Sequence, residues 1–257
     1  MRFPDIDPVI LQIGPLAVRW YGLMYLVGFV AAYLLIRKLA RLRNLPIDQD
    51  GISDLLFQGV IGVVLGGRLG YVLFYNPGWY LAHPLEIFAV WQGGMSFHGG
   101  LFGVTLASVW FCHRRALPLL LTGDVLVASA TIGLGCGRLG NFINGELWGR
   151  VTNLPWGIIF PGGGALPRHP SQLYQAVLEG GVLFALLYLM HRRKVRPGIP
   201  FFSFFLGYGL FRILAELFRE PDAHIGYLWG GVTMGQLLSL PMALFGGIGL
   251  MVVLRRQ

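Results

Sequence analysis

The chain has 257 residues, of which 55% are hydrophobic and only 12% are charged. An ordinary soluble domain carries about 25% charged residues, so this composition excludes a soluble globular protein and predicts a membrane protein. The net charge of +8 is concentrated in a few short connections between apolar stretches, which argues against a nucleic-acid partner.

About seven apolar stretches are long enough to be membrane-spanning helices. A hydrocarbon core of about 30 Å needs about 20 apolar residues per helix. In chain order the stretches are 18–36, 55–75, 95–112, 125–140, 172–190, 201–218 and 232–254, and the fourth is short and rich in glycine. The short alternating segments of a transmembrane β-barrel are not seen. We therefore expect an all-α polytopic membrane protein, a single transmembrane domain over residues 1–257 with a small extracytoplasmic segment at about 141–170.

Basic residues cluster in alternate connections and at the C-terminus. The clusters are Arg37, Lys38, Arg41 and Arg43; Arg114 and Arg115; Arg192, Arg193, Lys194 and Arg196; and Arg255 and Arg256. Under the positive-inside rule these connections face the cytoplasm, which predicts an N-terminus outside (periplasmic) and a C-terminus in the cytoplasm. A solvated basic face would explain the charge but not its alternation. The N-terminal residues lack the basic region and cleavage site of a signal peptide, so we expect them to be retained.

Charged residues also lie within or at the ends of the apolar stretches. A charged side chain at the bilayer centre costs at least about 2.5–3.5 kcal/mol, so such residues usually face a partner or a polar cavity. An ion pair that only joins helices would explain any one of them, but the whole set indicates a functional cavity. The set is Arg68, Arg138, Arg212, Glu146, Glu179 and Glu216.

The sixth stretch has the clearest geometry. Tyr208, Arg212 and Glu216 follow one another at intervals of four, so they share one helix face. Arg219 follows three residues later, near the outer end. Because the guanidinium fork matches phosphate oxygens and stays protonated in a low dielectric, this stripe predicts an anion site in which Glu216 orients Arg212.

Two further clusters contain polar residues among glycines. The first, at 135–146, carries Arg138, Asn141, Asn144 and Glu146, a set at the outer rim that helix packing alone does not explain. The second places His98 between glycine pairs at the start of the third stretch. Such a histidine is more often a packing residue, but a neutral imidazole also serves as a general base. The histidines show no metal-ligand spacing, so we expect no metal.

At these positions the sequence resembles the bacterial prolipoprotein diacylglyceryl transferase family. The matching motifs occur in family order across nearly the whole chain, and the run GRLGNFINGE at 137–146 is the most specific of them. The matching segments are 19–25, 66–71, 93–100, 137–149, 168–174, 211–222 and 234–236.

The resemblance implies a reaction, a location and a set of partners. The diacylglyceryl group of phosphatidylglycerol passes to the lipobox cysteine in the signal peptide of a preprolipoprotein, forming a thioether and releasing glycerol phosphate. This is the first step of lipoprotein maturation. Such an enzyme is a multi-pass protein of the bacterial cytoplasmic (inner) membrane, contacts membrane lipids, and needs no metal or organic cofactor.

The roles of the candidate residues follow as a hypothesis. We assign Arg138 and Arg212 to the phosphate, which the match to the family supports. His98 is our candidate base, with Tyr21 nearby as a positioning group, and these four form the catalytic set. Whether His98 or an arginine-lined pocket activates the thiol stays open at this point. The substrate-binding set is Arg138 with Arg68, Asn141, Asn144, Glu146, His169, Tyr208, Glu216 and Arg219.

Two other classes of protein fit parts of the pattern. A transporter or channel for an anionic solute would also place arginines and a histidine in a membrane cavity, but the odd number of stretches and the gathering of polar groups toward one face argue against it. An intramembrane hydrolase would need a nucleophile paired with a base. Ser96 and His98 are only two residues apart and form no triad.

Overall fold

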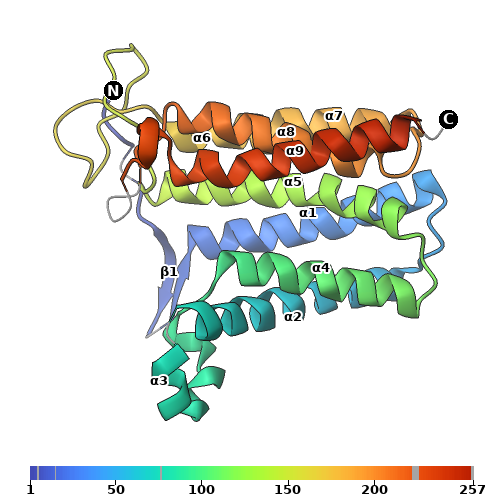
Figure 1. The fold of residues 1–257 in the computed structure, drawn as a ribbon. Coiled ribbons are helices and arrows are strands. Elements are labelled where there is room, and N and C mark those ends of the chain that lie inside the picture. Colours follow the sequence, from blue (N-terminus) through green and yellow to red (C-terminus); the bar gives the residue numbers. More distant parts are fainter. Residues whose placement is uncertain (5, 15, 76, 222–225, 256–257) are drawn as a thin grey trace. The chain divides into compact units, whose positions relative to one another are not determined.

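The computed structural model describes residues 1–4, 6–14, 16–75, 77–221 and 226–255, and Figure 1 shows its helical architecture. The chain divides into two compact units, which are described separately. Unit 1 comprises Met1–Arg43 and Gly123–Gln257, and unit 2 comprises Asn44–Thr122. The single transmembrane domain expected from the sequence stays a prediction.

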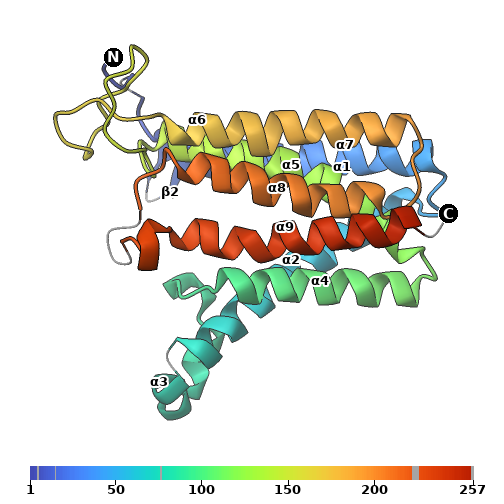
Figure 2. The same ribbon diagram turned by 45° about the horizontal axis from the view of Figure 1, so that its top comes forward.

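Unit 1 is a bundle of long helices preceded by a β-hairpin (Figure 2). The antiparallel hairpin pairs β1 with β2, and a long connection, 144–170, separates α5 from α6. The rod from Ser171 to Arg192 is continuous, although its middle part is a π-helix. The elements are β1 (Val9–Ile13), β2 (Leu16–Arg19), α1 (Trp20–Arg43), α5 (Leu119–Ile143, whose first turn belongs to unit 2), α6 (Ser171–Gln175), η3 (Ala176–Val182), α7 (Leu183–Arg192), α8 (Ile199–Glu216), η4 (Trp229–Gly231) and α9 (Met234–Arg255).

Close backbone approach joins α8 to α9. A Cβ atom built on Gly246 of α9 would lie only 2.6 Å from the carbonyl oxygen of Phe202 of α8, so no larger residue fits without displacing a helix. In lipid the hydrophobic effect does not drive helices together, and small residues allow the dense packing that does. The glycine content of the chain therefore serves helix association here.

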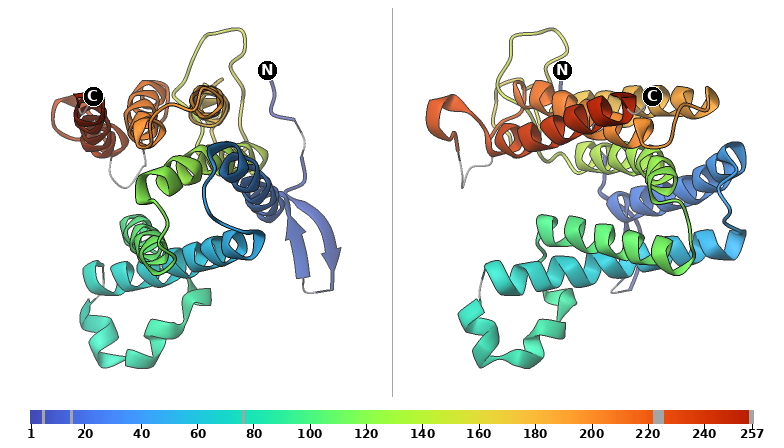
Figure 3. Two further views of the ribbon diagram at one scale, coloured as in Figure 1. Left: turned by 90° about the vertical axis from the view of Figure 1, so that its right-hand side faces the viewer. Right: turned by 45° about the vertical axis from the view of Figure 1, so that its right-hand side comes forward.

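Unit 2 is an antiparallel pair of long helices with a short helical connection, visible in Figure 3. Glycines line its interface as well: a Cβ atom built on Gly70 would lie 2.8 Å from the Cα atom of Gly99. The Asp48 side chain caps the first helix by accepting a hydrogen bond from the Gly51 amide at 2.8 Å. The elements are α2 (Gln49–Phe74), α3 (Pro77–Ala82), η1 (Pro84–Phe88), η2 (Val90–Gln92) and α4 (Phe97–Arg114).

The structure confirms a mainly helical membrane protein. Six helices of the described residues are long and apolar enough to cross a bilayer, and they include all the expected spans except 95–112. That stretch corresponds to α4, whose 18 residues extend about 27 Å but include His98, His113 and Arg114. The expected fourth span is longer than predicted, because α5 has 25 residues. The count of seven and the orientation of the termini stay predictions.

Basic residues gather at one end of unit 1, which we call its basic end. Arg41 and Arg43 lie in the last turn of α1, Arg192 in that of α7, and Arg255 in that of α9. Figures 1 and 2 show these three helices running in the same direction. The opposite end, where α1 and α9 begin, is called the site end below. Arg256 lies outside the described residues.

The adjacent glycines of α9 offer a test of this packing. We expect Gly246→Ala to destabilise the protein by about 1–3 kcal/mol, because the new methyl group meets the α8 backbone. A Cβ atom on Gly247 would have nothing within 4 Å, so Gly247→Ala is the matched control and should be neutral or slightly stabilising. Thermal unfolding of the purified variants in detergent measures both, and equal midpoints would contradict the packing argument.

Candidate active site

A buried carboxylate joins two arginines within unit 1. Glu179 Oε2 lies 3.6 Å from Arg138 Nε, and Glu179 Oε1 lies 3.7 Å from Arg212 Nη1. The Glu179 side chain is 0% exposed, and the side chains of Arg138 and Arg212 are 17% and 13% exposed. Three separate helical segments therefore bring their charges to one place.

Helix contact near Glu179 explains why these charges meet. A Cβ atom on Gly180 would lie 2.7 Å from the Cα atom of Gly135, so η3 and α5 approach each other backbone to backbone. Glu179 directly precedes Gly180, and Arg138 follows Gly135 by about one turn. Glu179 also lies within the π-helical stretch, and such segments occur frequently at functional sites.

Glu216 forms the second carboxylate of the cluster. Its Oε1 forms an ion pair with Arg212 Nη2 at 2.8 Å and accepts a hydrogen bond from Arg219 Nη1 at 3.0 Å, and its Oε2 accepts one from Thr233 Oγ1 at 2.9 Å. A Cβ atom on Gly235 would lie 2.5 Å from the Glu216 carboxyl carbon, so only glycine fits at this position in the first turn of α9. The predicted pairing of Arg212 with Glu216 on one face of α8 is thus present.

The cluster is rich in positive charge. Within the described residues, Arg138 and Arg212 pair with Glu179, and Arg212 and Arg219 pair with Glu216, so three guanidinium groups share two carboxylates. Among the described residues, the buried Arg212 Nη1 has no hydrogen-bond acceptor. Tyr208, also predicted here, lies close enough to Arg138 and Arg212 to interact with both. Because a buried donor without an acceptor is costly, the cluster favours binding of an anionic group.

The predicted asparagine cluster forms at the site end of α5. The Glu146 Oε1 atom accepts hydrogen bonds from Asn141 Nδ2 at 2.8 Å and from Asn144 Nδ2 at 3.3 Å. Tyr21 packs over Gly140, where a Cβ atom would lie 2.9 Å from the tyrosine ring. Tyr21 is also close enough to Glu146 and Arg138 to interact with both charges. The structure therefore brings Tyr21, Asn141, Asn144 and Glu146 beside the arginine cluster.

His169 lies in the connection between α5 and α6, among aromatic side chains. Its Nδ1 is 3.2 Å from the hydroxyl of Tyr174, which also accepts a hydrogen bond from Trp156 Nε1 at 2.8 Å. Its ring centroid lies 5.1 Å from that of Phe218. Partial burial and then the charge of Arg150 lower the pKa of His169. These contacts fasten the connection to the end of α8, and substrate binding by His169 stays a prediction.

Arg68 in unit 2 is committed to main-chain carbonyl groups. It is 4% exposed and donates to the carbonyl oxygens of Glu86, Ile87, Gly93 and Gly94 at 2.5, 2.8, 2.6 and 3.2 Å. Its guanidinium carbon also lies 5.2 Å from the Tyr80 ring centroid. The geometry shows a side chain that fixes the connection before α4, and the predicted substrate contact remains untested.

His98 lies in the first turn of α4, directly after that connection. The Ser96 hydroxyl caps the helix by accepting from the Gly99 amide at 3.2 Å, and the Ser96 amide donates to the Gly67 carbonyl at 2.8 Å. His98 is exposed on the surface of unit 2. Arg68 and the Ser96 cap therefore determine where the imidazole is presented.

Sequence reasoning noted Glu179 as an acidic residue in an apolar stretch but did not place it in the site. The buried amides Gln172 and Gln175 on the same rod were also missed. Polar residues at spacings of three and four along the expected fifth span were the available signal. Among the described residues there is no group of three or more His, Cys, Asp or Glu residues able to hold a metal.

Comparison with known proteins identifies close relatives. The family model described as prolipoprotein diacylglyceryl transferase matches residues 8–253. A protein of Geobacter sulfurreducens named phosphatidylglycerol–prolipoprotein diacylglyceryl transferase is 57% identical over 257 residues, which cover 100% of this chain and 99% of that protein. Proteins with the same name from Photobacterium profundum and Bordetella avium are 54% and 53% identical, covering 96% and 100% of this chain and 93% and 98% of their own lengths.

The buried pairing of Glu179 makes a second test possible. We expect Glu179→Ala to destabilise the protein by about 3–5 kcal/mol, because Arg138 and Arg212 lose their shared partner inside the bundle. Glu220→Ala is the matched control: this carboxylate pairs with Arg168 at 3.2 Å but is 48% exposed, so its loss should cost only about 0–1 kcal/mol. Chemical or thermal unfolding in detergent compares them, and similar losses would contradict the central place of Glu179.

Proposed function

Because this chain belongs to the prolipoprotein diacylglyceryl transferase family, we propose that it transfers the diacylglyceryl group of phosphatidylglycerol to the lipobox cysteine of a preprolipoprotein. The cysteine sulfur forms a bond to the glyceryl carbon while the bond from that carbon to the phosphate oxygen breaks. The products are a thioether and glycerol phosphate. Family membership favours this transferase reaction over the anion transporter and the intramembrane hydrolase.

The observation that carries the proposal is the buried cluster in which three arginines share two glutamates and in which Arg212 Nη1 has no hydrogen-bond acceptor among the described residues. The phosphodiester of phosphatidylglycerol is a monoanion and would supply that acceptor. As the ester bond breaks, the leaving phosphate gains a second negative charge. The arginines therefore bind the departing group more strongly than the intact lipid, which is the requirement for catalysis.

In this proposal Arg138 and Arg212 contact the phosphate. Glu179 and Glu216 hold the two guanidinium groups in place, and Arg219 adds charge through the same Glu216 oxygen that Arg212 contacts. Positioned donors in a dry site need no rearrangement during the reaction, so their full effect is available in the transition state.

The polar groups around the cluster have supporting roles in this proposal. Tyr21, Asn141, Asn144 and Glu146 provide the hydroxyl, amide and carboxylate groups that would hold the glycerol headgroup. Tyr208 supports the phosphate-binding arginines, and His169 holds the adjacent connection over the site. The mixture of donors and acceptors suits a headgroup that carries two hydroxyl groups and a phosphate.

We assign His98 as the base that takes the thiol proton. A thiol with a pKa near 8.5 is mostly protonated at neutral pH, so the reaction needs a proton acceptor or a strongly positive pocket. Arg68 acts here as a positioning residue, because its four hydrogen bonds fix the connection that leads into His98.

The proposed location is the bacterial cytoplasmic membrane, with seven spans when α4 is included and with the N-terminus outside. The basic end of unit 1 then faces the cytoplasm, and the candidate active site lies toward the outer leaflet. Phosphatidylglycerol and the signal peptide both reside in the membrane. They would therefore reach the site laterally, between helices.

A direct assay tests the reaction. The purified protein in liposomes receives phosphatidylglycerol and a lipobox peptide, and the peptide is followed by mass spectrometry. We expect a mass gain of one diacylglyceryl group that is absent when the peptide cysteine is replaced by serine. Absence of any gain with folded protein would overturn the proposal.

The phosphate role of Arg212 gives a quantitative prediction. Arg212→Ala should lower the transfer rate by at least about 10²–10³, the usual effect of removing one donor from a developing charge. Arg193→Ala removes an exposed arginine remote from the cluster and should leave the rate within about twofold. A near-normal rate in a folded Arg212→Ala protein would exclude the phosphate clamp.

The base role of His98 predicts a pH-dependent defect. His98→Gln should lower turnover at neutral pH by about 10²–10⁴, as expected for loss of a general base. Above about pH 9 the peptide thiol ionises without help, so the defect should shrink there. A defect of constant size across this pH range would instead indicate a structural role for His98. Full activity of the variant would eliminate both the base role and the structural role.

A further inference from the structure

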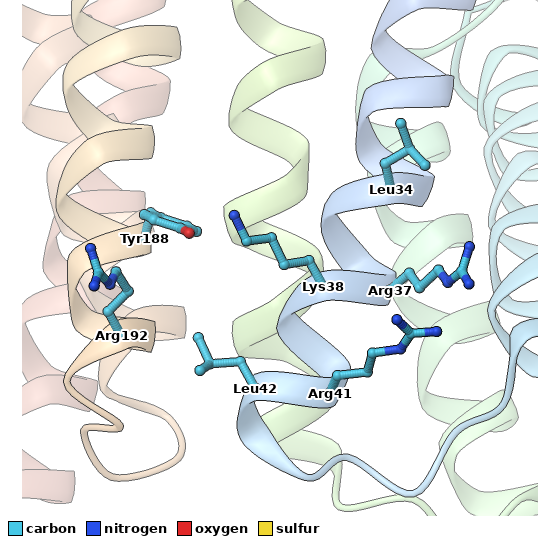
Figure 4. Close-up of a pocket in the computed structure, with 7 residues that line it drawn as sticks. All are labelled: Leu34, Arg37, Lys38, Arg41, Leu42, Tyr188 and Arg192. Atoms are coloured by element: carbon cyan, nitrogen blue, oxygen red, sulfur yellow. The ribbon is translucent and has the colours of Figure 1, made fainter.

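A basic groove lies between α1 and α7 at the basic end of unit 1 (Figure 4). Its volume is about 600 Å³. It is distinct from the candidate active site, because Lys38 lies about 25 Å along α1 from Tyr21 at a rise of about 1.5 Å per residue. The lining residues are Leu34, Arg37, Lys38, Arg41, Leu42, Tyr188 and Arg192.

The charge of this groove is not balanced by the protein. Four of the lining residues are cations, none is acidic, and within the described parts of the chain none of the four forms an ion pair. The C-terminal ends of α1 and α7 each contribute about half a negative charge, which offsets about one of the four. The buried Nε of Arg37 also has no hydrogen-bond partner among the described residues. The groove is therefore suited to an anionic ligand.

The two helices present matching rows of side chains to the groove. On α1, Val30, Leu34 and Lys38 follow at intervals of four, and Val30 and Leu34 are 52% and 56% exposed. The corresponding row on α7 is Phe184, Tyr188 and Arg192. Each row thus changes from apolar to cationic toward the basic end.

Contacts within and between these rows define the charged part of the groove. The rings of Phe184 and Tyr188 are stacked with centroids 5.6 Å apart. Figure 4 shows Lys38 extending toward Tyr188, whose ring centroid is 5.0 Å from Lys38 Nζ. A soluble anion would use only the cationic part of each row, whereas a phospholipid would use the apolar part as well.

Neighbouring contacts hold this end of the two helices together. Arg43 Nη2 donates to the carbonyl oxygen of Val195 at 2.6 Å, and Arg43 Nη1 is 3.4 Å from His191 Nδ1. His191 Nε2 in turn lies 3.1 Å from the carbonyl oxygen of Asp124. Arg43 and His191 are thus committed to the protein, and they keep the ends of α1 and α7 at the separation that forms the groove.

We propose that the basic groove binds the headgroup phosphate of an anionic phospholipid from the leaflet at the basic end. Lys38 and Arg192 contact the phosphate, and Val30 and Leu34 lie along an acyl chain. By the distribution of positive charge this is the cytoplasmic leaflet, so the groove is a second lipid site, separate from the proposed transfer reaction. A lipid that binds the folded protein but not the unfolded chain would also raise the free energy of unfolding.

Dioleoyl phosphatidate is a suitable probe, because it has one headgroup phosphate and is not the proposed donor. Native mass spectrometry of the full chain in neutral detergent counts bound lipids during a titration, with dioleoyl phosphatidylcholine as the zwitterionic comparison. We expect Lys38→Gln combined with Arg192→Gln to weaken one binding event at least tenfold. Arg193→Gln combined with Lys194→Gln makes the same charge change on exposed residues outside the groove, and it should change that event less than twofold.

Three results would overturn the proposal. Equal weakening in the two double variants would mean diffuse attraction to a basic surface. Displacement of phosphatidate by millimolar inorganic phosphate would mean a site for a soluble anion. Binding of phosphatidylcholine as tight as that of phosphatidate would mean that the cationic residues do not select the lipid.

A charge-preserving variant separates binding from folding. Lys38→Arg combined with Arg192→Lys keeps both charges and should retain phosphatidate binding. If the double glutamine variant does not fold, the single Lys38→Gln and Arg192→Gln proteins replace it, and each should show a smaller but measurable loss. Unchanged binding in both single variants would overturn the assignment of these residues.

Discussion

The cost of burying guanidinium groups in an apolar bundle is the constraint on which this structure depends. Arg138 and Arg212 belong to different helices and are mostly buried, yet neither can lose its proton in a protein. Glu179 lies between the two arginines and offsets the charge of both. Glu216 gives Arg212 a second carboxylate partner. The helices that carry these residues must therefore pack in an arrangement that keeps the charges together, and the same arrangement gathers three arginines in one place.

Glycine makes that arrangement possible, because a bilayer supplies no hydrophobic drive for helices to associate. The contact of Gly135 with Gly180 brings Arg138 toward Glu179, and Gly235 leaves space for the Glu216 carboxylate. The packing of α9 on α8 through Gly246 has the same character. Helix packing and site geometry are thus consequences of the same small residues.

Arginine serves three different purposes in this chain, and its partners distinguish them. Arg68 donates hydrogen bonds to backbone carbonyl groups and so holds the connection between α2 and α4 in place. Arg212 has carboxylate partners, but within the described residues one of its buried donors has no acceptor, which suits a ligand. Arg192 has no carboxylate partner among the described residues and lines the basic groove between α1 and α7. Charge alone therefore does not identify a binding arginine. What distinguishes the three is how many of their N–H donors already have an acceptor within the protein.

The sequence by itself determined the helical spans, the gathering of basic residues and the stripe that pairs Arg212 with Glu216, because hydropathy and the helical period act over a few neighbouring residues. Only the tertiary structure decided that Glu179 joins two arginines, that Arg68 is consumed by carbonyl groups, and that α1 and α7 enclose a basic groove. These features depend on which helices pack together and on a π-helical turn, and neither follows from local periodicity. Partners across a bundle are chosen by packing, and packing is a property of the whole chain.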